Sequence, residues 1–348
     1  MMMKIKILNN EKGIVLLLVI GLVSVLSIIT LQFGLEMRQQ YIVSAGLRNN
    51  FQLSEIAKSG IVITQGLLLQ DLEDNQFDSF FDSWALLADD DLAGLFEYGT
   101  VKVQVIDESG KFPVNAMVDL KKEGAKKPKD EKETKNRVQH EKDVRNILWR
   151  LIRAEPFLVE DGEAREIIDS LMDWIDSGDN NGEEEYGAED SHYMSLDPPY
   201  HCKNGPIESI EELLLVQGIT EELLYGTKEK PPLAPLLTVW GDDGKVNLNT
   251  ADVLLLQAMA FDIDKKAAES LITYREDEEN KDQLASPGWY KTAPSFPGDI
   301  DISESLTTTK SQFFTIKALA ESDELSKIVA ATIERDDKES SIVQWQTE

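Results

Sequence analysis

An acidic run between residues 169 and 190 contains the side chains with the clearest capacity for chemistry. Asp173 and Asp176 are three positions apart near the predicted end of a helix, so their carboxylates lie on one face. A glycine-containing loop follows, and its oxygen donors suit Ca²⁺. The candidate ligands are Asp173, Asp176, Asp179, Asn181, Glu183, Glu189 and Asp190. The run lacks the DxDxDG register of an EF-hand, and a solvated acidic loop accounts for the same residues, so both interpretations stay open.

Other signatures of chemistry are weak. His192, His201 and Cys202 are residue types that bind zinc, but their spacing matches no standard pair of ligands, so we expect surface residues and one inert thiol. The sequence contains no GxSxG, no HExxH and no phosphate-binding loop. We therefore expect a protein that is not an enzyme. The acidic run alone would support the other interpretation, a membrane-anchored metal-dependent hydrolase.

The charge balance limits the possible ligands of the chain. Its 348 residues include 35 lysines and arginines against 64 aspartates and glutamates, a net charge of −29. Such an acidic chain repels phosphate backbones and suits cations or basic partners. Cys202 is the single cysteine of the sequence, so no internal disulfide can form.

Residues 14 to 35 form an uncharged apolar stretch that is long enough to cross a membrane. As a helix it measures about 33 Å, against a hydrocarbon core of about 30 Å. Lys4, Lys6 and Lys12 precede it, so the positive-inside rule leaves the bulk of the chain outside the cytoplasm. Hydropathy alone indicates a signal anchor, whereas the Lys12-Gly13 pair directly before the stretch indicates a processing site.

The periodicity of apolar residues predicts the elements that follow. The first helix continues to residue 72, because helical spacing persists and no proline interrupts it, so its second half should pack on a soluble domain. Alternation predicts a strand at 100–106 and two closing strands at 313–320 and 326–334, with a third, short strand at 341–345.

Helical sequence separates the first strand from the closing strands. We expect helices at 143–152, at 163–175 and between Ser209 and Gly218, and a loop in the lysine-rich segment 121–135. A motif recurs here, because DESGKFPVNA at 107–116 is similar to DDGKVNLNTA at 242–251. Two copies of a small helical unit, inserted into a sheet, explain this repetition.

Six motifs in a fixed order run through nearly the whole chain. They are Lys12-Gly13 with Ile14 onward, GKFPVNA (110–116), LMDWIDSGD (171–179) with GAED (187–190), PPY (198–200), NGPIESIEELLLVQGI (204–219) and GKVNLNTA (244–251). Together they resemble the K family of type II secretion minor pseudopilins, GspK or general secretion pathway protein K. The leader alone would be weak, but the set is specific.

The resemblance implies an α+β fold. A pilin-like long N-terminal helix would pack on a small antiparallel sheet, with a large inserted all-α domain made of two SAM-like or helix-hairpin-helix-like units. The expected parts are a prepilin leader (1–13), a transmembrane helix (14–35), the first part of the pilin-like domain (36–108), the inserted helical domain (109–285) and the second part of the pilin-like domain (286–348).

The resemblance also implies roles for residues at the start of the mature chain. A prepilin peptidase would cleave after Gly13, and the new amino terminus at Ile14 would be methylated. Most pilins carry a glutamate at the position of Leu18, and its absence is typical of the K family and tolerable in a subunit with no neighbour above it. Because the family binds calcium in its helical domain, the resemblance favours the calcium interpretation of the acidic run.

The expected function is that of a minor pseudopilin at the tip of the periplasmic pseudopilus. Such a subunit initiates assembly and helps to export folded proteins across the outer membrane. The implied partners are the I- and J-type minor pseudopilins, the major pseudopilin and the prepilin peptidase. The implied location is the bacterial inner membrane, crossed once, with the bulk of the chain in the periplasm.

The alternative is a membrane-anchored DNA-binding or competence protein. VNLNTA and the following AAESLITYR are similar to helix-hairpin-helix units, which use a Gly-x-Gly hairpin to bind phosphate. Here that hairpin is AFDID (260–264), where both glycines are missing and Asp262 and Asp264 would face the phosphate. We therefore expect no binding of nucleic acid.

Overall fold

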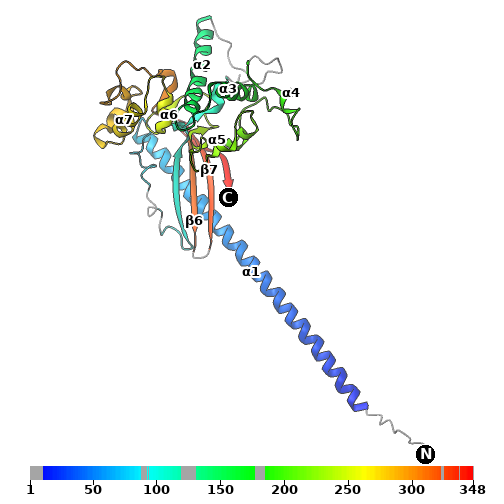
Figure 1. Ribbon diagram of the computed structural model, residues 1–348. Coiled ribbons are helices and arrows are strands. Elements are labelled where there is room, and N and C mark those ends of the chain that lie inside the picture. Colours follow the sequence, from blue (N-terminus) through cyan, green and yellow to red (C-terminus); the bar gives the residue numbers. More distant parts are fainter. Residues whose placement is uncertain are drawn as a thin grey trace, which may run out of the picture.

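The computed structural model describes residues 11–87, 92, 94–118, 131–176, 185–322, 325–336 and 338–347. It confirms the α+β class: a long helix leads into a small sheet, and a helical lobe lies at one end of that sheet (Figure 1). The helices are α1 (Glu11–Asp74), α2 (Glu131–Arg153), α3 (Asp161–Ile175), α4 (Asp190–Tyr193), α5 (Glu221–Tyr225), α6 (Val253–Ala258) and α7 (Lys265–Arg275). The strands are β1 (Thr100–Asp107), β2 (Phe112–Pro113), β3 (Leu237–Thr238), β4 (Val246–Asn247), β5 (Thr307–Thr308), β6 (Phe313–Glu321), β7 (Ser326–Arg335) and β8 (Ser340–Thr347).

Helix α1 is a single helix of 64 residues whose first part protrudes and whose last part packs on the sheet. From Leu53 onward one stripe is buried, which includes Ala57, Ile61 and Leu68. The stripe recurs every three or four residues, as expected for a helix with one face on a core. Gly60 lies on this face, where an added Cβ would come within 2.9 Å of the Val101 side chain, so glycine permits the close approach of α1 to β1.

The sheet has four strands in the order β1-β6-β7-β8, and all neighbours are antiparallel. Helix α1 packs on one face of it, against β1, β6 and β7. Alternate residues of β6, such as Phe314, Ile316 and Ala318, point into the core between sheet and helix. The predicted long helix, first strand and closing strands are thus confirmed, and the last strand is longer than the predicted 341–345.

The helical lobe contains two units that begin and end alike. In the first, β2 pairs in parallel with β3, and in the second, β4 pairs in parallel with β5. Each opening strand follows a Gly-Lys turn of the repeated motif, and each closing strand follows a short 3₁₀ helix. The units share one continuous hydrophobic core that extends from Phe112 to Leu306. The domain boundary expected at residue 285 falls inside this core, because Trp289 and Ile302 belong to it.

Two predicted segments differ from the structure. Helix α2 begins at Glu131, so residues 131–135 are helical where a loop was expected, and the helix starts before the predicted residue 143. Lysine and glutamate favour helix, but without apolar periodicity they gave no helical signal. The segment expected as a helix between Ser209 and Gly218 is a 3₁₀ helix over Ile210–Leu215.

Candidate functional site

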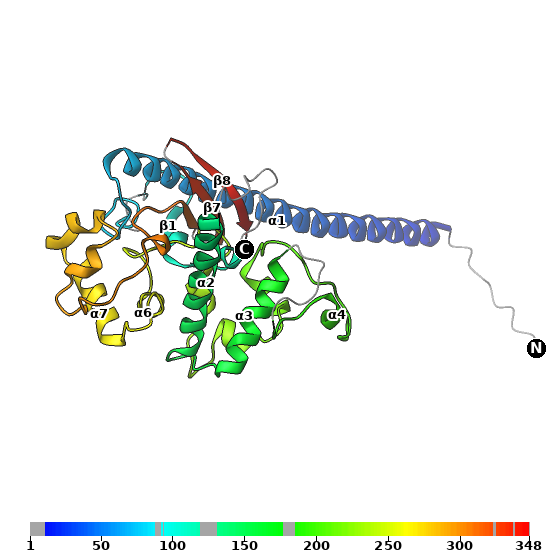
Figure 2. The same ribbon diagram turned by 90° about the horizontal axis from the view of Figure 1, so that it is seen from above.

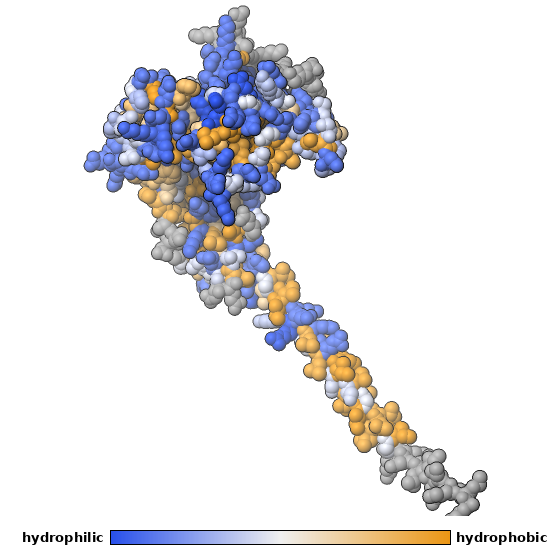
Figure 3. Space-filling model, viewed as in Figure 1, coloured by the Kyte–Doolittle hydropathy of each residue, from blue (hydrophilic) through white to orange (hydrophobic). Residues whose placement is uncertain are grey.

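The protruding part of α1 carries a long apolar surface that touches nothing else in the described part of the chain. Leu17, Leu18 and Leu31 are 71%, 68% and 69% exposed, and exposed apolar residues continue to Phe51. Figure 3 shows this surface as a mostly orange rod below the lobe. Among the described residues, α1 is the one helix long and apolar enough to cross a membrane, and its most apolar window is entirely exposed. A surface of this kind requires lipid or other helices around it.

The two residues of the predicted processing site lie at the start of α1. Gly13 is in the first turn of the helix, and Ile14 is 62% exposed. Leu18 lies one turn further on the same exposed rod. Its side chain faces outward with no polar group to satisfy, as an apolar residue in a membrane-crossing helix should. Lys4 and Lys6 lie outside the described residues.

The structure brings four of the seven predicted calcium ligands into one region. Asp173 is buried near the end of α3, Asp176 is its C-cap, and Glu189 and Asp190 lie at the start of α4. Asp179, Asn181 and Glu183 lie outside the described residues. Cys202 connects the two helices, because its amide donates to Asp190 Oδ1 (3.0 Å) and its thiol lies 3.5 Å from the Asp173 carbonyl oxygen.

The donor types in this region suit calcium better than zinc, although the carboxylates that the described residues bring within 4.8 Å of one another lie elsewhere. An added Cβ at Gly187 would lie 1.7 Å from Asp173 Oδ2, so this glycine allows the backbone to pass directly over a buried carboxylate. All the candidate donors there are oxygens, which Ca²⁺ prefers. Burial, with smaller effects of Glu189 and Asp173, raises the pKa of Cys202 to about 11, so the thiol is not a ready metal ligand. His201 is exposed and its Nδ1 lies 2.9 Å from Asp190 Oδ1.

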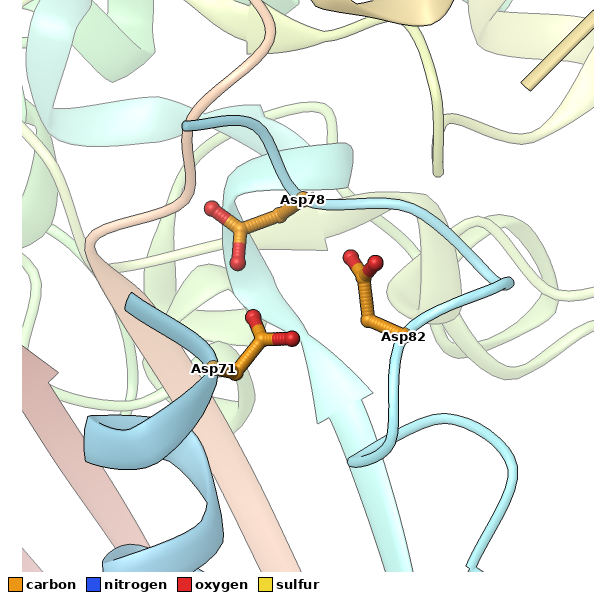
Figure 4. Close-up of side chains that lie close together, drawn as sticks. All are labelled: Asp71, Asp78 and Asp82. Atoms are coloured by element: carbon orange, nitrogen blue, oxygen red, sulfur yellow. The ribbon is translucent and has the colours of Figure 1, made fainter. Parts of the chain in front are cut away.

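A second acidic group, not recognised in the sequence, is buried where α1 ends. Asp71 lies in the last turn of α1, Asp78 and Asp82 lie in the following loop, and oxygens of all three carboxylates lie within 4.8 Å of one another (Figure 4). Asn75 bridges two of them, because its Nδ2 donates to Asp82 Oδ1 (2.9 Å) and Asp71 Oδ1 (3.4 Å). The sequence signal that could have revealed this group is the placement of three aspartates, one in the last turn of a helix and two in the loop that follows it.

Arg335 supplies the positive charge of this acidic group. At the end of β7 its Nη2 binds Asp78 Oδ1, its Nη1 lies 3.7 Å from Asp71 Oδ2, and the side chain is only 2% exposed. The Arg335 Nη1 also donates to the Leu68 carbonyl oxygen at 3.0 Å. Burial, and then the neighbouring Asp78, raises the pKa of Asp71. The arrangement therefore joins three chain segments, and an arginine already occupies the position where a cation would balance it.

Asp107, the last residue of β1, links the sheet to the second unit of the lobe. Its Oδ2 accepts from Ser311 Oγ (2.6 Å), Thr250 Oγ1 (2.5 Å) and Asn247 Nδ2 (3.2 Å). Burial raises its pKa to about 6, although these hydrogen bonds lower it. Thr250 and Asn247 belong to the second copy of the repeated motif, so that copy forms the joint between lobe and sheet.

The equivalent asparagines of the repeat both donate from the side-chain amide to two backbone carbonyl oxygens distant in sequence. Asn115 Nδ2 donates to the carbonyl oxygens of Ile207 (2.9 Å) and Val239 (2.7 Å), and its Oδ1 accepts from the Ile207 amide. Asn249 Nδ2 donates to the carbonyl oxygens of Asp78 (3.0 Å) and Leu284 (3.2 Å). Both are buried, which explains why asparagine recurs at this position.

The hairpin between α6 and α7 does not present a phosphate site. Asp264 is the N-cap of α7 and its carboxylate accepts from the Ala267 amide at 2.7 Å. The backbone amide that a bound phosphate would need therefore already donates its hydrogen bond to a carboxylate. Phe261 at the tip is 79% exposed and Asp262 is exposed beside it. The expectation of no nucleic acid at this hairpin is consistent with this geometry.

Three comparisons relate the chain to known proteins. Residues 110–241 match the family model described as type II secretion system protein K. A type II secretion system protein K of Pseudomonas aeruginosa PAO1 is 28% identical over 275 residues, 77% of this chain and 73% of that protein. One of Aeromonas hydrophila is 31% identical over 174 residues, 47% of this chain and 48% of that protein. A putative type II secretion system protein K of Escherichia coli K12 is 27% identical over 219 residues, 62% of this chain and 60% of that protein.

A solved structure has the same fold. It is a chain of the GspK-GspI-GspJ complex from the type II secretion system of enterotoxigenic Escherichia coli. The alignment covers 88% of this chain and 99% of that chain, with a TM-score of 0.63 and 18% sequence identity. At this identity the likeness concerns the fold alone.

Proposed function

This chain belongs to the type II secretion system protein K family and is a minor pseudopilin, and from that premise we propose that it occupies the tip of the pseudopilus. The observation that carries the proposal is the relation between α1 and the lobe. In both Figure 1 and Figure 2, α6 and α7 lie at the end of the molecule opposite the amino terminus. A lobe at that end would collide with a subunit stacked above, and no such subunit exists at a tip.

The protruding rod of α1 is the surface through which the subunit joins the assembly. We propose that it crosses the inner membrane once, with the bulk of the chain in the periplasm, and packs against helices of the I- and J-type minor pseudopilins and the major pseudopilin. The relative in the solved structure forms a complex with GspI and GspJ, which supports this choice of partners. Initiating assembly and aiding the export of folded proteins across the outer membrane follow from the tip position.

The amino terminus would be generated by a prepilin peptidase. Cleavage after Gly13 leaves Ile14 as the first residue, which would then be methylated. Leu18 replaces the acid that most pilins carry, so this position offers no carboxylate to a neighbouring amino terminus. Such a loss suits the first subunit of a filament, since no subunit above presents its amino terminus.

Calcium is proposed for the region between α3 and α4. Asp173, Asp176, Glu189 and Asp190 would hold it, together with the predicted ligands Asp179, Asn181 and Glu183. When bound, the ion would neutralise part of an acidic surface and fix the connection between the helices. The role is structural, and no described group of side chains suggests catalysis.

The DNA-binding alternative has no observation in its favour. The charge of the chain, the capped start of α7 and the acids at the hairpin all oppose phosphate.

Three measurements test the proposal. Mass spectrometry of the purified chain should find N-methyl-isoleucine at Ile14, and an intact leader would contradict the processing step. Immunogold labelling should place the chain at filament ends, and labelling along the shaft would contradict the tip position. Deletion of the gene should abolish export, while Leu18→Ala, which keeps the helix apolar, should not.

A further inference from the structure

Strand β8 is an edge of the sheet, and its pairing with β7 has one irregularity, a register shift between Thr332 and Ile333. In the part of the chain that the structure describes, it pairs with β7 alone, at the end of the order β1-β6-β7-β8. Its sequence, SSIVQWQT, contains no charged residue and no proline over eight residues. Natural edge strands normally carry lysine, proline or a cover against unwanted pairing, and the opposite edge, β1, carries Lys102 and Asp107. An uncharged edge of this length is a template for another strand.

The side chains of β8 divide between two different environments. Trp345 pairs with Ala331, whose side chain is buried under α1, so Trp345 lies on the α1 face of the sheet, 46% exposed. Gln344 and Gln346 lie on the other face, where they line a groove of about 260 Å³ together with Lys317 and Tyr225. A strand added to β8 would thus meet an apolar flank on one face and a polar groove on the other.

The first residue of β8 also contacts α1. Gln65 of α1 donates from Nε2 to Ser340 Oγ (2.9 Å) and to the Ser340 carbonyl oxygen (3.2 Å). Because this edge of the sheet begins at α1, a partner whose helix packs along α1 would bring its own globular domain close to β8.

We propose that β8 pairs with an edge strand of a neighbouring minor pseudopilin, so that one sheet continues from subunit to subunit. This inference rests on the proposed function and adds to it the contact by which the globular parts join. The incoming strand would be uncharged at its centre, with an apolar side chain beside Trp345 and polar side chains toward Gln344. Main-chain hydrogen bonds supply the pairing, and these alternating side chains supply the selectivity.

A second copy of this chain is a poorer occupant than a different subunit. Each copy carries a net charge of −29, and pairing of two β8 strands would place two such charges side by side. A different subunit avoids this repulsion if its surface is less acidic.

The test compares lysine substitutions at the two edges of the sheet. The full chain is purified in detergent with the co-expressed I- and J-type pseudopilins of the same system. Trp345→Lys and Val343→Lys add a charge to the free edge, and Gln104→Lys adds the same charge to β1. We expect the first two to lower the recovered complex by about tenfold and the third to leave it unchanged. Equal recovery for all three variants would overturn the proposal.

Hydrogen exchange on the wild-type complex tests the pairing without relying on a variant. The amides of 340–347 should exchange more slowly in the complex than in the chain alone, and unchanged exchange would overturn the proposal. Slow exchange in the chain alone, with a dimer on size-exclusion chromatography, would overturn the choice of occupant. If the wild-type chain recovers no pseudopilin at all, the proposed function itself fails, which is a different result.

Discussion

Arg335 at the end of β7 and Asp78 in the loop after α1 form an ion pair whose side chains are only 2% and 4% exposed. The guanidinium also lies 4.6 Å from the centre of the Phe314 ring, within the core of the sheet. The pair therefore fixes the membrane-distal end of α1 to the last core strand. This connection matters because, in the proposed function, α1 is the element through which the subunit would join its assembly.

Removing one partner of this ion pair should destabilise the globular part strongly. Arg335→Met would leave Asp78 and Asp71 buried without their cation, at a cost of about 3–5 kcal/mol in the free energy of unfolding. Urea unfolding of the chain in detergent, followed by tryptophan fluorescence, measures the loss. The double variant Arg335→Met with Asp78→Leu should lose less than the sum of the two single variants. Additive losses would show that the two residues do not act together.

The buried acids Asp82 and Asp107 should make stability fall as pH rises. Burial raises the pKa of each to about 6, above the ordinary value of 3.8. The folded state then binds the proton more tightly than the unfolded state, so this contribution to stability is complete below about pH 4 and is lost as pH rises through 6. Asp82→Asn should raise the unfolding free energy at pH 7.5 by up to about 3 kcal/mol.

As a control, the unfolding free energies of Asp82→Asn and wild type are compared at a low pH, where the difference between them should disappear. At pH 4 the wild-type carboxyl is already protonated, so Asp82→Asn and wild type should unfold alike. Asp299→Asn, at an exposed position, should change neither curve. A stabilisation by Asp82→Asn that is equal at pH 4 and pH 7.5 would contradict a charge-based cause.

Asn115 should be essential to the first unit of the lobe. Asn115→Ala would leave the Ile207 amide and carbonyl and the Val239 carbonyl without this partner inside the core, which should cost about 2–4 kcal/mol. The matched control is Asn146→Ala on the exposed face of α2, where we expect little change because alanine favours helix. Thermal unfolding followed by circular dichroism compares the two. Equal melting temperatures for Asn115→Ala and Asn146→Ala would show that the hydrogen bonds of Asn115 do not stabilise the fold.

Calcium should stabilise the chain through the region between α3 and α4. We expect Ca²⁺ to raise the melting temperature by several degrees relative to a chelator, as binding to the folded state alone does. Asp176→Asn, which removes one proposed ligand, should abolish most of this response, and Asp299→Asn should keep it. Identical melting curves with calcium and with chelator would show that the acidic run is a solvated loop.

The sequence alone predicted most of the architecture because the apolar residues of each long helix and strand recur with the spacing typical of that element. The apolar stretch from residue 14, the continued helical spacing to residue 72 and the alternation in 313–320 fixed helix and strands through local burial patterns. The repeated Gly-Lys motif predicted two related units, and its asparagines, Asn115 and Asn249, occupy equivalent places in them. These features are determined by neighbours in the chain, and a sequence displays them directly.

Only the tertiary structure decided which distant residues meet. Asp71, Asp78 and Asp82 resembled ordinary surface acids until the end of β7 placed Arg335 between the segments that carry them. The contact of β8 with α1 through Gln65 joins residues 275 positions apart, and no period encodes such a pair. Burial of charge and the free edge of a sheet are consequences of packing between segments. The sequence therefore determined the elements and their order, whereas the fold decided which charges are buried and which edge stays open.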